Sequence, residues 1–244
     1  SMTARMRLPV LIVAAAAMDA TAEHLLDELR NVVTDVYTDG SPEYDETIKM
    51  GGVLGQRSSP PQVVAQPLNQ EEVEGAMKWA DHHGFRVSVK SSGTQPGGFA
   101  MLGDIMLDMK HLRSVTVDDG IVLVQGGATW ADVYNATDAA GLNVNGGRLE
   151  DSVAGTVLSG GIGLWGYKHG LIADGVMHAN VVMPNGEVVH ATHSKKPRGG
   201  LPAPAEALYN LRGGFPLGVI TKLELQAHPM HTPMVAGKLH CTFA

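Results

Sequence analysis

Cysteine, aromatic residues and positive charge are all scarce in this chain of 244 residues. Its single cysteine, Cys241, leaves no possibility of an intrachain disulfide framework or a cysteine-rich zinc site. The 18 lysines and arginines are outnumbered by 25 aspartates and glutamates, which gives a net charge of −7. This balance argues against a protein that binds the phosphate backbone of nucleic acids, because that function needs clustered cations. We expect no nucleic-acid partner.

A hydrophobic run long enough for a membrane span is also missing. The apolar residues 8–18 follow Arg5 and Arg7, and this start resembles a secretory signal peptide. Its eleven residues cannot cross a bilayer, so we expect no membrane partner. We predict a packed N-terminal segment in a cytoplasmic protein, and secretion is the alternative if residues 5–20 are a signal peptide.

Glycine, in contrast, is abundant at 30 residues, which suits a backbone that approaches a ligand closely at several places. Helical spacing of apolar residues predicts a helix over residues 20–36, before a loop-rich stretch that ends at Pro60-Pro61. The next elements are predicted to be a strand at 63–66, a helix at 72–83, and strands at 86–89 and 104–108. They form a parallel βαβ unit.

After Val115 the pattern changes to β-rich runs, with helices between them. The predicted strands and helices are, in order, 121–125, a helix at 130–140, a helix within 159–169, 179–183, 188–192 and 219–226. Pro184-Asn185-Gly186 predicts a hairpin turn, because Asn-Gly tolerates the positive φ angles of such turns. The fold class is therefore α+β with two lobes, a small parallel lobe and a larger mixed or antiparallel β lobe with helices.

The expected divisions of the chain follow from these elements. They are an N-terminal segment with a helix that packs on the domain at 1–59, a first lobe at 60–115, a second lobe at 116–229 and a tail at 230–244. Tryptophans at helical positions, Trp79, Trp130 and Trp165, are predicted to anchor the core or the interface between lobes.

Three loops of small residues carry the functional prediction. Residues 90–98 (KSSGTQPGG) follow a predicted strand, and the N–H groups of such a loop can converge on an anion. Gly126-Gly127-Ala128 follows another strand, while Gly155 and residues 159–163 (SGGIG) precede or open a predicted helix. Three such loops indicate a long ligand between two lobes, such as a dinucleotide. None has the spacing of a Rossmann fingerprint or a P-loop.

Six blocks in one order make residues 61–229 resemble the FAD domain of the PCMH type, that of p-cresol methylhydroxylase and vanillyl-alcohol oxidase, in its berberine-bridge branch. The blocks are PQVVAQPLNQEEV, the small-residue loop, VQGGATWADV, GGIGLWGYKHGLIADGV, NGEVV and ALYNLRGGFPLGVIT. The resemblance implies FAD lying between two lobes and an oxidoreductase that acts on a small organic or natural-product substrate. The alternative is a flavin-binding pseudo-enzyme or a non-redox cyclase in which FAD is structural.

The same resemblance implies which residues contact the cofactor. They are Ser91, Ser92, Gly93, Thr94 and Gln95 around the pyrophosphate; Gly127, Ala128, Thr129, Val153, Ala154 and Gly155 along the path from adenosine to ribityl; Gly160, Gly161 and Gly163 in support; Asp174 and Val182 at the adenine end; and Ile220 near the hinge. No catalytic residue is implied. Tyr167, Lys168 and His169 beside the third loop are the side chains we select for chemistry, against the alternative of a helix end that favours basic residues.

Departures from the family pattern concern how the flavin is held. Members of this branch commonly attach it through a histidine in the first loop and a cysteine before the third, where this chain has Thr94 and Arg148 or a neighbour. We therefore expect noncovalent FAD. The family's substrate domain is also expected to be missing, so a homodimer or a partner chain would complete the site.

The histidines near the C-terminus do not change this prediction. His228 and His231, with His240 and Cys241, have no recognised zinc spacing, and we expect no metal.

Overall fold

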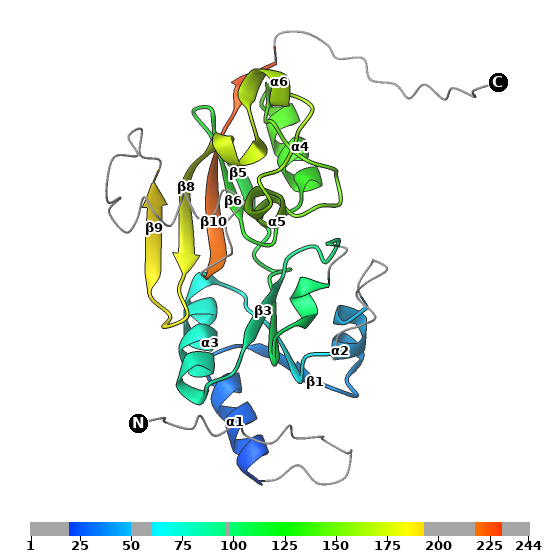
Figure 1. Cartoon of the computed structure of the whole chain (residues 1–244), viewed down its shortest axis with the longest axis vertical. Helices are drawn as coiled ribbons and strands as arrows, with labels where there is room; N and C mark the ends of the chain where they lie inside the picture. The colour runs from blue at the N-terminus through cyan, green and yellow to red at the C-terminus, as the bar shows by residue number, and fades with distance from the viewer. Residues whose placement is uncertain (1–19, 50–59, 96–97, 193–217, 231–244) are drawn as a thin grey trace, which may run out of the picture.

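The computed structural model describes residues 20–49, 60–95, 98–192 and 218–230 as two lobes stacked along one long axis (Figure 1). A four-stranded sheet forms the first lobe and a five-stranded sheet the second. The two-lobed α+β fold expected from the sequence is confirmed. Within these ranges, no helix is long and apolar enough to cross a membrane.

The first lobe has its sheet in the order β1-β2-β4-β3, with β2, β4 and β3 parallel and β1 antiparallel to β2. Its elements are α1 (Ala20–Arg30), β1 (Asp35–Thr38), α2 (Pro42–Thr47), β2 (Val63–Gln66), α3 (Gln70–His83), β3 (Val87–Lys90), η2 (Phe99–Met101) and β4 (Ile105–Asp108). Asn69 caps α3 by accepting a hydrogen bond from the N–H of Glu72, and Gly84 ends the helix with a φ of +74°. The predicted parallel βαβ unit is confirmed.

The prediction of one helix over residues 20–36 is wrong at its C-terminal end. Helix α1 stops at Arg30, and Asp35–Thr38 forms the edge strand β1. Thr34 fixes this change of direction, since both its N–H and its hydroxyl donate to the carboxylate of Glu72. A strand of this kind depends on the β2 edge that it pairs with, and apolar spacing cannot reveal that edge.

The second lobe has an antiparallel sheet in the order β5-β6-β10-β8-β9. Its elements are β5 (Val115–Asp118), β6 (Ile121–Gln125), α4 (Trp130–Ala139), β7 (Leu142–Asn143), α5 (Val153–Leu158), α6 (Gly166–His169), η3 (Ile172–Gly175), β8 (Val176–Val182), β9 (Val188–Thr192), β10 (Val219–Gln226) and β11 (His228–Pro229). The predicted strands and the helix at α4 are confirmed within a few residues. The helix expected within 159–169 forms only at the C-terminal end of that range, as α6. The SGGIG loop therefore follows helix α5 instead of opening a helix.

The predicted hairpin joins β8 to β9, although its backbone differs from the expectation. Only Gly186 of the turn has a positive φ, +76°, whereas the Asn185 side chain accepts a hydrogen bond from the N–H of Glu187. The hairpin between β5 and β6 was not predicted. Its turn, Asp119-Gly120, has positive φ at both residues, the Asp-Gly signal that identifies such turns.

One hydrophobic core joins the two lobes. Val182 and Val219, from the sheet of the second lobe, are buried in the cluster that α3 and the first sheet form. The Gln70 side chain of α3 also accepts hydrogen bonds from Asn180 and Thr221 of the second sheet. The lobes are therefore held in a fixed relation, as a site between them requires.

Candidate cofactor site

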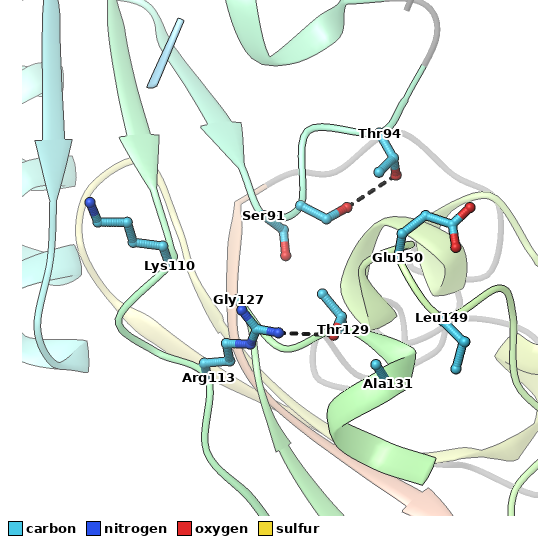
Figure 2. A pocket seen from close by; sticks show the side chains of 10 residues that line it. Ser91, Thr94, Lys110, Arg113, Gly127, Thr129, Ala131, Leu149 and Glu150 are labelled. Atoms are coloured by element: carbon cyan, nitrogen blue, oxygen red, sulfur yellow. Dashed lines mark hydrogen bonds between the residues drawn. The ribbon is translucent and has the colours of Figure 1, made fainter. Parts of the chain in front are cut away.

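A cavity of about 530 Å³ lies between the lobes, where the first sheet ends and helix α4 begins (Figure 2). Its lining residues come from both lobes and from the connection between them; they are Ser91, Ser92, Thr94, Lys110, Arg113, Gly127, Thr129, Ala131, Leu149 and Glu150. Five of the ten were predicted from the sequence as cofactor contacts. Hydroxyl groups and cations dominate the polar part of this lining.

The first loop, residues 91–95, leaves β3 and is fixed to the second lobe by two hydrogen bonds. The Ser91 hydroxyl donates to the carbonyl of Gly126 at 2.8 Å, and the Thr94 hydroxyl donates to Asp151 at 2.8 Å. Gly93 has a φ of +74°, which allows the loop to reverse direction. The loop that we expect at the pyrophosphate thus spans the cavity from one lobe to the other.

Asp151 connects the two positions at which relatives are expected to tether the flavin. Its carboxylate accepts the hydroxyl of Thr94 and two hydrogen bonds from the guanidinium of Arg148, both at 2.9 Å. The hydrogen bonds from Arg148 lower the pKa of Asp151 most, burial acts in the opposite direction, and Thr94 lowers it further. Two positions far apart in the sequence therefore meet at one ionised carboxylate.

Replacing Asp151 with asparagine is expected to reduce stability at neutral pH and to flatten its acid dependence. A depressed carboxyl pKa contributes stability that is complete above the unfolded value of about 3.9 and is lost as the pH falls through the folded value. The melting temperatures of Asp151→Asn and wild type should therefore differ at pH 7 and converge toward pH 3. Asp118→Asn is the control, because this exposed aspartate has no ion pair or side-chain hydrogen bond among the described residues. A constant difference across this range would contradict the assignment.

The second loop is packed against the segment that connects the lobes. A side chain at Gly126 would overlap the carbonyl oxygen of Ile220, and one at Gly127 would overlap that of Met109. Ala128 is fully buried, and its N–H and carbonyl are hydrogen-bonded to Gln125 and Val153, so its contact with the cofactor stays a prediction. Thr129 caps α4 and lines the cavity. The glycines at this turn are required by the close approach of two backbones.

The third group of predicted residues begins helix α5 and continues into the glycine loop. Val153 and Ala154 are buried, and Gly155 lies in the same first turn, where its N–H donates to Ser152. Gly160 and Gly161 have φ angles of +81° and +68°, and their carbonyls accept hydrogen bonds from the start of η3. A side chain at Gly163 would overlap Asn145. None of these residues lines the cavity, so their contact with the cofactor stays a prediction.

Three other predicted contacts lie in different surroundings. Val182 is fully buried in the core that joins the lobes, while Ile220 is buried beside Gly126. Asp174 accepts a hydrogen bond from the N–H of Leu171 and lines a separate cavity of about 400 Å³ at the far end of the second lobe. Gln95 is in the first loop but is not among the residues that line the cavity between lobes.

The side chains selected for chemistry lie away from the cavity between lobes. Tyr167 is 84% exposed, and neither Lys168 nor His169 lines that cavity. His169 faces the second cavity and stacks on His228 with ring centres 3.8 Å apart. Burial lowers the pKa of His228, and so do His169 and Lys168. The interpretation of α6 as a helix end that carries basic residues therefore fits better.

No group of three metal-ligating side chains occurs in the part of the chain that the structure describes. Of the C-terminal histidines considered from the sequence, His228 is described, whereas His231, His240 and Cys241 lie outside the described residues.

Five lining residues were missed from the sequence: Lys110, Arg113, Ala131, Leu149 and Glu150. Arg113 donates to Asp132 at 2.6 Å and to Thr129 at 3.3 Å, and Glu150 is paired with Arg148 at 3.6 Å. The one sequence signal was the pair of cations, Lys110 and Arg113, near the end of the predicted first lobe. With four hydroxyl groups, these charges suit an elongated ligand that carries phosphate and sugar hydroxyls.

Two lobes with such loops between them define the cofactor domain of a flavoprotein. A family model described as an FAD binding domain matches residues 61–192. The chain belongs to this FAD-binding family, and its fold is that of the PCMH type. Its cofactor is FAD, and the lining fits this group, since hydroxyls and cations face the cavity where a pyrophosphate and a ribityl chain require donors.

Similar proteins of known sequence include (R)-6-hydroxynicotine oxidase of Paenarthrobacter nicotinovorans, 28% identical over 75% of this chain and 39% of that protein. Chitooligosaccharide oxidase of Gibberella zeae is 30% identical over 68% of this chain and 34% of its own length. The chain thus spans well under half the length of these relatives.

Solved structures give the same result for the fold. The 6-hydroxy-D-nicotine oxidase of Arthrobacter nicotinovorans has a TM-score of 0.71 at 26% identity, over 80% of this chain and 42% of that one. BBE-like 1 of Physcomitrella patens has a TM-score of 0.74 over 84% of this chain and 44% of that one, and at 22% identity it supports the fold alone.

Proposed function

We propose that this chain holds FAD without a covalent bond, as part of an oxidoreductase that oxidises a small organic or natural-product substrate. The observation that supports noncovalent binding most is the shared carboxylate of Asp151, which engages both Thr94 and Arg148. The resemblance gives these as the tethering positions, and neither carries a histidine or a cysteine. A threonine hydroxyl is a poor nucleophile, and Asp151 is a weak base for it because the pKa of this carboxyl is lowered; a guanidinium is no nucleophile.

Bound FAD would accept a hydride from the substrate, and the chain would supply position and electrostatics. Residues 91–94 and the turn at Gly127 would hold the cofactor from opposite lobes, and their hydrogen bonds to Asp151 and to the connecting segment would keep that spacing. Two relatives, oxidases of (R)-6-hydroxynicotine and of chitooligosaccharide, support a small organic or sugar-like substrate class.

A second chain or a further segment is needed to complete the reaction site in this proposal. Among the described residues, the cavity lining holds no histidine, tyrosine or cysteine, and its one carboxylate, Glu150, is largely exposed. Large apolar side chains near the third loop are also exposed, among them Ile162 at 88% and Leu164 at 81%. A homodimer or a hetero-complex would cover them. A strict monomer of 25.7 kDa by light scattering at micromolar concentration would remove this part of the proposal.

The purified chain is expected to be yellow and to release its flavin when it is precipitated with acid. Noncovalent contacts are lost on denaturation, whereas a bond to the flavin methyl would survive it. Absorption spectra of the supernatant and of the redissolved pellet measure the two fractions. Flavin that stays in the pellet would contradict noncovalent binding, and a colourless chain that also ignores added FAD in calorimetry would contradict the whole proposal.

A flavin-binding pseudo-enzyme or a non-redox cyclase is the second candidate. The position of Tyr167, Lys168 and His169 outside the cavity favours it, because among the described residues the lining then offers no histidine or tyrosine as an acid or base. Anaerobic screening separates the two functions. Bleaching of the bound flavin by a donor substrate supports the oxidoreductase, and a flavin that dithionite reduces but no organic donor reduces supports the structural role.

A further inference from the structure

The segment that connects the two lobes, residues 109–114, brings two cations to the cavity. Arg113 extends from it toward Gly127 and Thr129, whereas the Lys110 side chain, which also lines the cavity, carries its ammonium group away from Arg113 and Ser91 (Figure 2). Lys110 makes no hydrogen bond or ion pair with any described residue. Because the four-carbon stem of lysine is flexible, a lysine without a partner beside a cavity can turn toward an anionic ligand.

Arg113 is held in place although about half of its side chain is exposed. Its Nε donates to Asp132 at 2.6 Å and its Nη2 to the Thr129 hydroxyl at 3.3 Å. Asp132 is itself fixed, since it also accepts the N–H and the hydroxyl of Thr129, each at 2.8 Å. Nη1, the remaining terminal nitrogen, has no hydrogen-bond partner among the described residues.

The carboxylate of Asp132 remains ionised in this arrangement. Burial by itself raises its pKa, but the hydrogen bonds from Arg113 and Thr129 outweigh burial, so the pKa is lowered. Asp132 therefore fixes the direction of Arg113 through a direct ion pair at its Nε. Removing Arg113 would leave an uncompensated negative charge at the cavity, which would repel an anionic ligand.

We propose that Arg113, positioned by Asp132, and Lys110 bind the pyrophosphate of FAD from the side of the connecting segment, opposite the loop at residues 91–94. This assignment rests on the proposed noncovalent binding of FAD. A guanidinium with a free donor suits a phosphate oxygen, because such charge-assisted hydrogen bonds are short and directional. Lys110 adds an attraction that depends less on direction and more on salt. FAD would then be preferred over riboflavin, which has no phosphate.

The test measures dissociation constants of FAD and riboflavin for the full 244-residue chain after its flavin has been removed, by quenching of flavin fluorescence. Lys110→Gln should weaken FAD binding by about fivefold, and Arg113→Gln by about thirtyfold, because it also exposes Asp132. The double variant Arg113→Gln with Asp132→Asn should recover part of this loss, to about tenfold. Riboflavin binding should not change in any variant.

Two controls separate this proposal from a general effect on the fold. Lys49→Gln removes a cation that lies outside the cavity lining, and FAD binding should stay as in the wild type. When the salt concentration is raised from about 50 mM to about 200 mM, the affinity of the wild type for FAD should fall more than the affinity of Lys110→Gln.

Wild-type affinity for FAD in Lys110→Gln and Arg113→Gln would overturn the assignment while leaving FAD binding intact. An equal loss for riboflavin would also overturn it, because the side chains would then act on protein structure. A wild-type chain that binds neither flavin would instead overturn the proposed function.

Discussion

Replacing Gly127 with alanine is expected to reduce FAD binding at least tenfold and to lower the free energy of unfolding by about 3 kcal/mol. A Cβ at this position would overlap the carbonyl oxygen of Met109 and lie 3.0 Å from that of Leu112. Both neighbours are backbone, so no side chain can rotate away. The N–H of Gly127 also donates to Leu112, which ties the turn to the segment that carries Lys110 and Arg113.

Urea unfolding and a fluorescence titration with FAD measure the two effects of Gly127→Ala. Gly166→Ala is the matched control in the same lobe, because nothing lies within 4 Å of its Cβ and the residue is in helix α6. Alanine there should leave FAD binding unchanged and stability equal or slightly higher. Wild-type stability and affinity in Gly127→Ala would show that the close approach of the two backbones is not required.

Local signals in the sequence were sufficient for much of the fold and for one side of the site. The strands at β2, β6, β9 and β10 were predicted at their observed bounds, because short apolar runs end at clear turn residues. The first loop was also predicted, since small and hydroxyl residues directly follow a strand. Such features depend on neighbours within about ten residues, which a single sequence contains.

Contacts between segments far apart in the sequence could not be predicted. Thr94 and Asp151 are 57 residues apart, and no spacing rule connects a hydroxyl in one lobe with a carboxylate in the other. The role of Arg113 likewise depends on Asp132, 19 residues later, at the start of a helix in the second lobe. Strand β1 was missed for the same reason, because its partner edge is β2. The sequence thus predicted where the loops lie but not the hydrogen bonds and the ion pair that hold them together.

Replacing Trp130 with alanine is expected to cost about 3 to 5 kcal/mol of the free energy of unfolding. The Trp130 ring is fully buried, and its Nε1 donates to the Thr156 hydroxyl at 3.0 Å. A Cβ at Gly146 would lie 2.5 Å from the six-membered ring of the indole, and one at Gly147 would lie 2.9 Å from its Nε1. The indole therefore fixes α4, α5 and the loop between them as one unit.

Loss of this packing should also disturb the cofactor site, because Thr129 and Ala131, the residues before and after Trp130, line the cavity. Trp130→Phe keeps most of the buried volume and should lose clearly less stability than Trp130→Ala in urea unfolding. Trp165→Ala is the matched control, since this tryptophan is only partly buried and packs beside the exposed Tyr167. Equal losses of stability at Trp130 and Trp165 would mean that burial of the Trp130 indole does not hold α4, α5 and the loop between them together. The loops alone would then determine the shape of the cavity.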